Sequence, residues 1–452
     1  MYRIRLTITR LYKSFYYQHE VYDKGRILKY SESAIYPVEP KDRVLTGVDL
    51  ALLWAGSAIV VDVWYSGGYL YPIGWIPGTL LIILGSFVGS VIFAAAGVIG
   101  SDLGIPSMVT VRPSFGLRGS YLMSALNYVT LIGWTAWMLF INASAADQIG
   151  SILFNFTGFP YWVLVGGVIC TALAIFGAEG WKLFNRASVT ALLVTSLVLN
   201  YFVFVNYGWD YLASKPSWGM PPGVAFDLAL IMPLSWAPLA ADYMRFARSS
   251  KGGFVGSLIG QGSVNSWFYI TGLACALAFG MYDPTVYVTR VGGFIFGIIA
   301  LFVIWFGTIT TTFLDIYSAN MSIINIFPKV KEWQGSVITG VAGIIIAFLP
   351  WLEAFVQFLY IIGAVFVPLF AVVVVDYFLL KKRRYSIQDL YSPSGRYWFR
   401  HGVSLIAMIA WMVGVAIYYA VQQFLPDLGA TLPSYIATSV LYYVMRRGFG
   451  DL

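Results

Sequence analysis

Apolar segments of membrane-spanning length recur along this chain. Lipid offers the peptide backbone no hydrogen-bond partner, so each segment that crosses the bilayer core must be a self-bonded helix of about 20 mostly apolar residues. Of the 452 residues, 59% are hydrophobic and only 11% are charged, whereas a soluble domain is about 25% charged. The sequence therefore predicts an all-α polytopic membrane protein. It excludes a disordered chain, a secreted disulfide scaffold and a nucleic-acid-binding protein.

A window of this length places twelve transmembrane helices. We expect them at residues 46–69, 75–97, 121–149, 161–178, 187–205, 225–246, 253–280, 293–316, 336–349, 355–380, 402–424 and 432–445. Before them lies a segment (1–45) whose first 43 residues lack the apolar stretch and small-residue site of a cleavable signal peptide. The chain then divides into spans one to five (46–205), spans six to ten (225–380), a polar loop (381–401) and spans eleven and twelve (402–447).

The basic residues predict the orientation of these spans. Of 28 lysines and arginines, 26 fall on one side of the twelve-span plan, and only Lys215 and Arg290 fall on the other. Loops rich in lysine and arginine stay in the cytoplasm. We therefore expect a multi-pass protein of the cell membrane with both termini in the cytoplasm.

Of the acidic residues within the apolar spans, two stand out, because charged side chains inside a membrane helix are rare and usually functional. Asp62 is near the middle of span one, and Asp315 is toward the cytoplasmic end of span eight. Either could be a structural acid that accepts hydrogen bonds from a neighbouring helix. We favour a ligand or ion contact for Asp62, and for Asp315 the two interpretations are balanced.

Span six contains two prolines, Pro233 and Pro238, five residues apart. Each removes a backbone donor and frees a carbonyl about one turn earlier, so we expect an interrupted helix. A proline kink is the simpler alternative. Transporters built from two inverted repeats of five helices place their broken helices five spans apart, and span one has small residues around Asp62. This spacing predicts a five-plus-five inverted repeat, although the halves share no direct sequence similarity.

Tryptophans at membrane depth favour a flat cargo. Trp134 of span three and Trp236 of span six could stack on a planar heterocycle, while Ser235, Asp62 and opened backbone groups bind its polar edge. The chain is 17% aromatic, so we expect its other tryptophans to be packing or interfacial residues.

Hydroxyl groups in span eight indicate a cation site. Thr310 and Thr311, together with carbonyls freed near Gly56 and Ile59, would form an oxygen cage for a monovalent cation such as sodium. Threonines in membrane helices also bond to the carbonyl four residues earlier or to an adjacent helix, which is the structural alternative.

Four motifs lie within or beside the predicted spans. They are Arg112-Pro113-Ser114-Phe115-Gly116-Leu117-Arg118-Gly119-Ser120 before span three, Gly133-Trp134 within it, Ala241-Asp242-Tyr243-Met244-Arg245-Phe246-Ala247-Arg248 after span six, and Val375-Asp376-Tyr377-Phe378 followed by Lys381-Lys382-Arg383-Arg384-Tyr385. From Val48 to about Arg447 the chain resembles the nucleobase:cation symporter family one, the cytosine, purine, allantoin and hydantoin permeases. Residues 232–236, 311–318 and Asp62 resemble the branch assigned to hydroxymethylpyrimidine, a thiamine precursor, with cytosine or a purine as alternative substrates.

The resemblance implies a leucine-transporter-like fold in which spans one to ten form the inverted repeat and spans eleven and twelve are accessory. It also implies coupling to sodium or protons and alternating access. Trp134 matches the tryptophan of family members that stacks on the substrate. The sodium positions match this chain at Gly56 and Ile59 of span one and at Gly307, Thr310 and Thr311 of span eight.

The chain also departs from the family pattern at three positions near the substrate. Met138 replaces a glutamine that some members carry, and their substrate-binding asparagine falls at Ile316, beside Asp315. The span-six tryptophan of the hydantoin permease falls at Pro233, with Trp236 one turn later. These differences leave the identity of the heterocycle open.

Three other functions are compatible with a polytopic membrane protein. An amino-acid carrier of the same architecture would place a substrate carboxylate beside Asp62, which would repel it. A membrane-embedded enzyme would need paired catalytic acids or a metal motif, and Cys170 and Cys275 are instead isolated within apolar segments. A passive channel would show neither ion coupling nor saturation. We expect a transporter that acts as a monomer, with no cofactor apart from the co-transported Na⁺ or H⁺.

Overall fold

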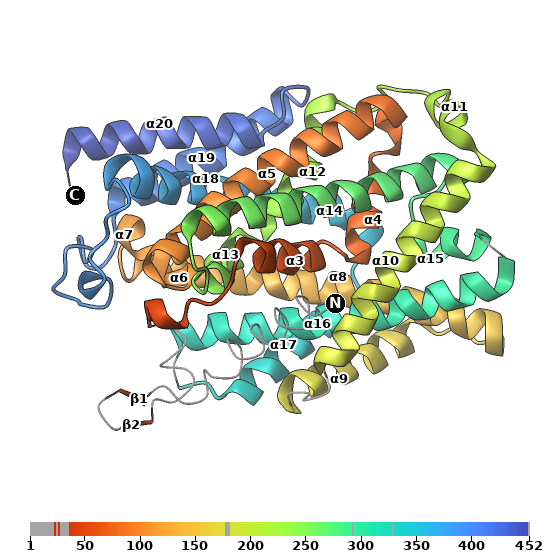
Figure 1. Cartoon of the computed structure of the whole chain (residues 1–452), viewed down its shortest axis with the longest axis horizontal. Helices are drawn as coiled ribbons and strands as arrows, with labels where there is room; N and C mark the ends of the chain where they lie inside the picture. Colours follow the sequence, from red (N-terminus) through yellow and green to blue (C-terminus); the bar gives the residue numbers. More distant parts are fainter. Residues whose placement is uncertain are drawn as a thin grey trace.

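The computed structural model describes residues 36–176, 181–291, 293–327 and 329–450, and also the paired strands β1 (Tyr22–Asp23) and β2 (Arg26–Ile27). The rest of the described chain is helices and their connections, and most long helices run along the long axis of the molecule (Figure 1). The prediction of an all-α protein is therefore confirmed. Most of the N-terminal segment 1–45 and the last two residues of predicted span four lie outside the described residues.

Helices occupy the five predicted spans of the first half. After η2 (Pro40–Asp42), span one consists of α3 (Gly47–Ser57) and α4 (Val61–Tyr69), followed by η3 (Tyr71–Ile73). Spans two to five are α5 (Trp75–Leu103), α8 (Gly119–Phe154), α9 (Phe159–Phe176) and α10 (Trp181–Asn206). Short helices lie between them at α6 (Ser107–Thr110), α7 (Arg112–Phe115) and α11 (Gly208–Ala213).

The second half follows the same plan. Span six is α12 (Pro222–Ser235) and α13 (Ala237–Met244), and span seven is α14 (Ser250–Phe279), followed by α15 (Pro284–Tyr287) and η4 (Val288–Arg290). Next come α16 (Gly293–Ile326), α17 (Glu332–Ile346) and α18 (Trp351–Val374), which continues into a π-helix, η5 (Val375–Leu380). After η6 (Gln388–Leu390), the chain ends with α19 (Leu405–Phe424) and α20 (Thr431–Phe449).

The lengths of the helices suit a multi-pass membrane protein. Among the described residues, eight helices are long and apolar enough to cross a membrane, or up to ten if each of two sharply bent pairs is one span. The bent pairs are α3 with α4, at 65°, and α14 with Pro284–Arg290, at 62°. Predicted spans nine and twelve correspond to α17, with 15 residues, and α20, with 19. The total of twelve membrane crossings stays a prediction.

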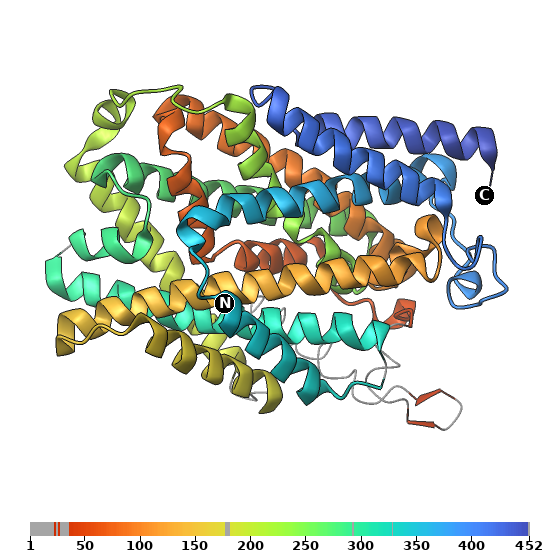
Figure 2. The ribbon, with the colours of Figure 1, turned by 180° about the vertical axis from the view of Figure 1, so that it is seen from behind.

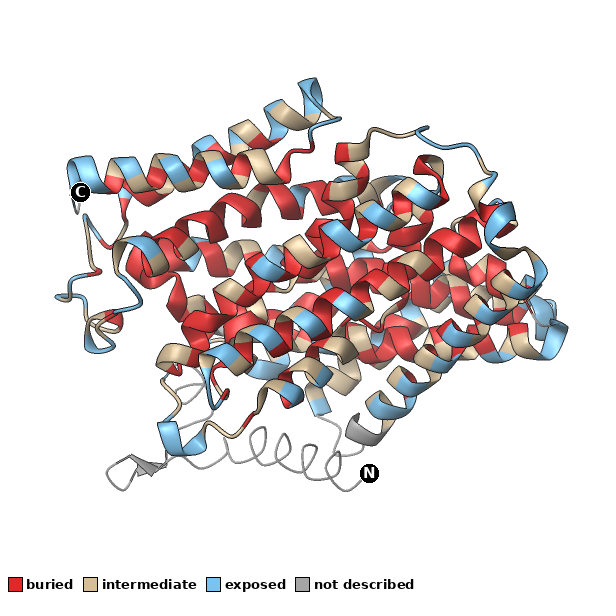
Figure 3. Ribbon diagram, turned by 45° about the horizontal axis from the view of Figure 1, so that its top comes forward, coloured by how far each residue is buried: buried red, intermediate tan, exposed pale blue. Residues whose placement is uncertain are grey.

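Two groups of helices pack around the break in span one. In the first group, α14 packs against α3, α4 and α5, while α5 also contacts α12 and α13. In the second group, α16 packs against α8, α9, α10 and α17. Figure 3 shows that the buried residues concentrate in the middle of the molecule. From behind, α19 and α20 lie together along one margin (Figure 2).

Caps at the helix ends fix where α3 and α14 begin and where α5 and α14 end. The Thr46 side chain accepts a hydrogen bond from the Asp49 amide while the Asp49 carboxylate bonds back to Thr46, which completes a capping box at the start of α3. Ser249 caps α14 by accepting from the Gly252 amide. Gly104 and Gly280 end α5 and α14 at φ 76° and 69°, a backbone region that glycine enters without steric cost.

Candidate functional site

The break in span one is a sharp irregularity inside an apolar span. α3 ends at Ser57, α4 begins at Val61, and Val60 between them is extended, with φ −139° and ψ 151°. No proline is present here. The Ser57 hydroxyl donates to the Trp54 carbonyl at 2.8 Å, a bond that competes with the helical bonds of the backbone. A side chain at Gly56 would meet no atom within 4 Å, so there is free space beside the end of α3.

The break places Asp62 in the first turn of α4, where amide groups have no helical partner. The side chain is 4% exposed, and its Oδ1 accepts a hydrogen bond from the Val63 amide at 3.0 Å. The Ser66 hydroxyl donates to the Asp62 main-chain carbonyl. No side chain in the described part of the chain donates to the Asp62 carboxylate. The carboxylate is therefore available to a further donor.

Asp315 lies on α16, which packs against α4. It is 9% exposed, and its Oδ2 is buried without a hydrogen-bond partner among the described residues. Its carboxylate interacts electrostatically with that of Asp62. The structure therefore brings together the two acids that the sequence analysis singled out.

Span six is interrupted, but less sharply than predicted. α12 ends at Ser235 and α13 begins at Ala237, with Trp236 as the residue between them. The two segments nevertheless form one apolar span, Pro222–Met244, without the bend of more than 40° that separates α3 from α4. Pro233 lies inside α12. A proline deletes only one amide donor, so the helix can continue past it. Span six is thus disrupted locally, whereas span one is broken.

The two predicted stacking residues differ in their surroundings. Trp134 on α8 is 9% exposed. The rings of Phe355 and Phe358 make edge-to-face contacts with it, at centroid distances of 6.3 and 5.2 Å. No aromatic ring among the described residues stacks on its face. Trp236 is half-buried and meets Trp54 edge-on at 6.1 Å. Ser235, beside it, donates its hydroxyl to the Met232 carbonyl at 2.7 Å.

Two other tryptophans of the same spans belong to the core. Trp137 is fully buried and stacks on Phe355 at 4.1 Å and on Phe140 at 5.7 Å. Trp64 is also fully buried and stacks on Phe268 at 5.6 Å. Both rings are occupied by packing, as expected for a chain so rich in aromatic residues.

The predicted cation ligands lie at the end of α3, within the break and on α16. Gly56 is the penultimate residue of α3, and its carbonyl accepts from the Ile59 amide at 3.3 Å. On α16, the hydroxyls of Thr310 and Thr311 both donate to the Gly307 carbonyl, at 2.7 and 3.2 Å. Both hydroxyls therefore donate to a carbonyl of their own helix, which is the structural role expected as the alternative to cation binding. Each hydroxyl oxygen still has lone pairs with which it could bind a cation.

Sequence reasoning missed Gln261, which joins the break to span seven. Gln261 lies on α14, is 1% exposed, and its Oε1 accepts from the Ser57 hydroxyl at 3.0 Å. A buried amide in a membrane helix costs free energy unless it is hydrogen-bonded. A polar residue inside an apolar span was the available signal.

A second bend, after span seven, was also missed because the predicted span ended at Gly280. Asp283 caps α15 by accepting from the Thr285 amide, and it also accepts from the Tyr65 hydroxyl of α4. Pro284 follows as the first residue of α15. The pair Asp283-Pro284 is a typical helix start, and it was the signal for this bend.

The motif before α8 has a structural role. Arg112 is 5% exposed, donates to the Leu390 carbonyl at 3.1 Å and lies 5.3 Å from the centre of the Tyr391 ring. Burial lowers the pKa of its guanidinium. Gly116 has φ 91°, and a side chain there would collide with the Gly402 carbonyl. The motif therefore fastens the loop 381–401 and the start of α19 to α8.

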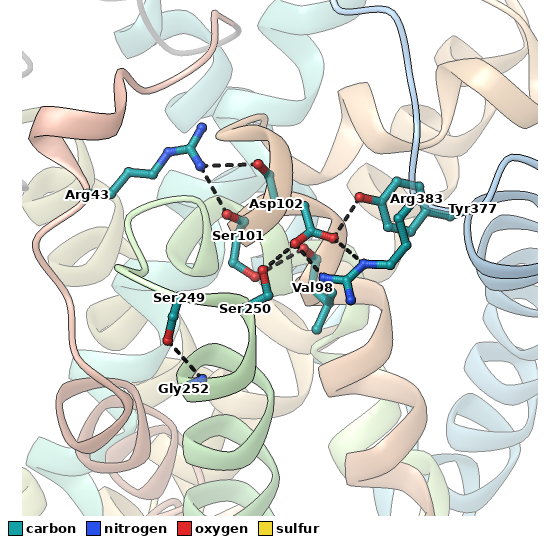
Figure 4. Close-up of polar contacts among 9 residues, drawn as sticks. All are labelled: Arg43, Val98, Ser101, Asp102, Ser249, Ser250, Gly252, Tyr377 and Arg383. Atoms are coloured by element: carbon teal, nitrogen blue, oxygen red, sulfur yellow. Dashed lines mark hydrogen bonds and ion pairs between the residues drawn. The ribbon is translucent and has the colours of Figure 1, made fainter.

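A polar network around Asp102 ties distant segments together at one end of the molecule (Figure 4). The Asp102 carboxylate accepts from Arg383 at 2.9 and 2.7 Å, from the Tyr377 hydroxyl at 2.7 Å and from the Ser250 hydroxyl. Arg43 donates to two carbonyls at the end of α5, both at 3.1 Å. Bonding to Asp102 raises the pKa of Arg383. The network connects α5, α14, the end of α18 and the segment before α3.

Comparisons with known proteins agree with this architecture. Residues 37–442 match the family model described as a permease for cytosine/purines, uracil, thiamine and allantoin. A hydantoin permease of Microbacterium maritypicum is 24% identical over 421 residues, which covers 87% of this chain and 84% of the relative. A cytosine permease of Escherichia coli K12 is 25% identical over 404 residues, 88% of each chain.

Solved structures show the same fold. The inward-facing conformation of Mhp1 superimposes with a TM-score of 0.84 at 21% identity, over 94% of this chain and 95% of that one. A closed conformation of Mhp1 with bromovinylhydantoin bound gives 0.79 at 20% identity, over 93% and 96%. The fold is therefore the leucine-transporter-like one, and the chain is a multi-pass membrane protein. This chain belongs to the nucleobase:cation symporter family one, the permeases for cytosine/purines, uracil, thiamine and allantoin, and is a cation-coupled transporter and not an enzyme.

Proposed function

We propose that this protein is a symporter that imports a planar nitrogen heterocycle, such as cytosine, a purine or hydroxymethylpyrimidine, with sodium or protons. It would work by alternating access around the break in span one, as a monomer in the cell membrane. Names of the relatives support this class of substrate, since they include hydantoin and cytosine permeases.

The observation that carries the proposal is the geometry of span one. An apolar span bends by 65° and presents a buried carboxylate, Asp62, directly after the break. In lipid, a free helix end is tolerated only where other protein groups or a cavity receive it, and transporters use such ends to bind substrates. Asp62 would accept a hydrogen bond from an exocyclic amine of the ring, because a carboxylate offers only acceptors. Asp315 would assist from α16.

For the ring we propose stacking on Trp134, whose face no aromatic ring among the described residues covers. Trp236 and Ser235 would close on the substrate from span six, where the helix is interrupted at Trp236. An aromatic pair contributes about 0.5–1.5 kcal/mol beyond the burial of its area, so stacking provides affinity with little dependence on ring substituents. Discrimination among heterocycles then depends on the polar edge.

We propose that the co-transported cation is bound by five oxygen atoms. They are the carbonyls of Gly56, Ile59 and Gly307 and the hydroxyls of Thr310 and Thr311. The contact between α4 and α16 supports this arrangement, since it brings the broken span against the helix that carries the threonine run. A cation that stabilises the substrate-binding state raises substrate affinity, and by linkage the substrate raises cation affinity equally.

For the topology we propose twelve membrane crossings, with spans one to ten as a five-plus-five inverted repeat and spans eleven and twelve as accessory helices. The packing supports the repeat. Spans one and two pack with six and seven, and spans three and four pack with eight and nine, so the first four members of each half are neighbours of their counterparts.

A thermal-shift screen of the purified protein tests the proposal. The ligands are cytosine, adenine, hydantoin and hydroxymethylpyrimidine, each with sodium and with potassium as the control cation. A ligand that binds only the folded state raises the melting temperature, by an amount that corresponds to about 2.7 kcal/mol at one hundred times its Kd. Saturating shifts with at least one ring would support the proposal. No shift with any ring, in a sample whose melting remains cooperative, would contradict it.

A further inference from the structure

The two buried acids at the break form a cluster with a definite charge requirement. Asp62 of α4 and Asp315 of α16 are 4% and 9% exposed and interact with one another electrostatically. Tyr269 of α14 interacts electrostatically with Asp62, and Cys170 of α9 with Asp315. No lysine, arginine or histidine in the described part of the chain neutralises the pair.

Such a pair is costly in its fully ionised form unless a positive group completes it. Two like charges in a low-dielectric interior repel strongly, and a buried acceptor without a donor loses its hydration without compensation. Asp62 has a backbone amide as its donor, whereas the buried Oδ2 of Asp315 has no partner among the described residues. The unpartnered oxygen is a second, independent sign that the cluster receives a ligand with N–H donors.

We propose that Asp62 and Asp315 together select a heterocycle that carries an amidine edge, a ring nitrogen beside an exocyclic amine, and bind it in its protonated form. An amidinium presents parallel N–H groups with one shared positive charge, which complements carboxylate oxygens in geometry and in charge. 4-Aminopyrimidines and cytosine have this edge. Uracil and hydantoin present a ring N–H between two carbonyl oxygens on the corresponding edge, so an acceptor oxygen would face the carboxylates in the place of the amine donor.

This inference rests on the proposed function and narrows it to one class of substrate. The site would accept amine-bearing pyrimidines and reject their oxo counterparts of nearly equal size. Discrimination of this kind can be large, because a rejected ligand leaves buried polar groups of the site unpaired. Size and stacking cannot produce it, since both members of such a pair have the same flat ring.

Matched ligand pairs test the inference on the intact purified protein. We would measure Kd by calorimetry for cytosine against uracil and for 4-aminopyrimidine against pyrimidin-4-one. The expected result is that each amine binds at least about ten-fold more tightly than its oxo partner. Affinity for 2,4-diaminopyrimidine should also fall as the pH rises through the pKa of that ligand, because the neutral ring loses its charge.

Variants assign the preference to the two acids. Asp315→Asn and Asp62→Asn should each lower the ratio of affinities for the amine and its oxo partner toward one. Asp315→Glu keeps a carboxylate and should retain part of the preference. The control is Asp227→Asn, since Asp227 is a buried acid of α12 whose carboxylate already accepts from the Ala430 and Thr431 amides. This control should retain the full preference.

The outcomes separate this inference from the proposed function. Equal affinity for amine and oxo partners in the parent protein, or a preference that survives both Asp62→Asn and Asp315→Asn, would overturn the amidine site while leaving a heterocycle transporter intact. If no ring of either kind binds, both the site and the proposed function are wrong. Because the ligand pairs are compared in the unmodified protein, the test stands even if a variant fails to fold.

Discussion

Trp134 and Trp137 lie three residues apart on α8 and differ in what covers their rings. Trp137 stacks on Phe355 and Phe140, so its faces are used in packing. Trp134 has only edge contacts with the aromatic rings of α18 among the described residues. The sequence places both within the same span and does not show which ring is covered, because the tightest stack, of Phe355 on Trp137, comes from α18, more than 200 residues further along the chain.

Trp134→Ala should lower affinity for ring ligands by about ten-fold or more, since it removes the stacking surface. Expression and monodispersity should stay near those of the parent, and Trp134→Phe should recover much of the binding. Kd for a bound ring and the elution profile of the purified variant are the measurements. Trp137→Ala is the contrasting variant, because loss of a fully buried ring typically costs about 3–5 kcal/mol of stability. Unchanged ring affinity in Trp134→Ala would remove Trp134 from the site.

Thr311→Ala should shift the sodium dependence of ring binding. If the Thr311 hydroxyl ligates the cation, its loss should raise the sodium concentration for half-maximal binding by about ten-fold, because contacts to charged groups contribute about 1.5–3 kcal/mol. The matched control is Thr312→Ala, whose hydroxyl donates to the Thr308 carbonyl on the same helix and is fully buried. Sodium titrations of ring binding compare the three proteins. Superimposed curves for Thr311→Ala and the parent would exclude this hydroxyl as a ligand.

At the level of helices, α14 holds the broken span through backbone contacts at glycines. A side chain at Gly256 or Gly260 would collide with the carbonyls of Gly47 and Ala51 in α3, and one at Gly272 would collide with the Trp64 carbonyl in α4. Both halves of span one therefore lie close against one continuous helix. The bend of span one is fixed by this contact and not by the flexibility of the chain.

Gly260→Ala should destabilise the protein by about 1–3 kcal/mol, because the added methyl group forces the backbones of α14 and α3 apart. Gly448→Ala on α20 is the control, since no atom lies within 4 Å of the added carbon there. That change should be neutral or slightly stabilising, as alanine favours helix over glycine. The measurement is the melting temperature of each variant relative to the parent protein. Equal shifts for Gly260→Ala and Gly448→Ala would contradict the close packing of α14 against α3.

The interruptions themselves were predictable to different degrees. The small residues and Asp62 pointed to span one, and the break lies there. Pro233 and Pro238 pointed to span six, where Pro233 lies inside α12 and Pro238 lies in the first turn of α13, with Trp236 alone between the two helices. The first turn of a helix accepts a proline because its amides have no helical partner. The bend after α14 went unseen because a Gly280 C-cap looks like the end of a span. Local sequence marks where a helix can break, and packing decides how far it bends.

On the scale of the whole molecule, the five-plus-five inverted repeat stays a prediction. Spans one and six, and spans three and eight, were expected to correspond, and in the fold α4 contacts α12 while α8 packs against α16. The polar ties that hold the ends of the bundle, such as Asp102 with Arg383, join residues far apart in the chain and could not be inferred from it. Their partners are brought together only by the fold.

Orientation in the membrane is the remaining whole-molecule prediction, and the cysteine content makes it testable. Cys170 and Cys275 are buried at 0% and 1% exposure, so the parent protein should not react with a membrane-impermeant maleimide. Lys215→Cys, in the loop before α12, should be labelled in intact cells. Lys382→Cys, after α18, should be labelled only once the membrane is opened, because basic loops remain in the cytoplasm.

The two cysteine variants control for one another, since each is reactive in opened membranes and only the side differs. The reverse pattern would place the 26 basic residues of the predicted cytoplasmic loops outside, against the usual bias. Labelling of both in intact cells would mean that the chain crosses the membrane an even number of times between residues 215 and 382. Five crossings in that interval, spans six to ten, require opposite sides, so this single comparison tests the second half of the proposed repeat together with its orientation.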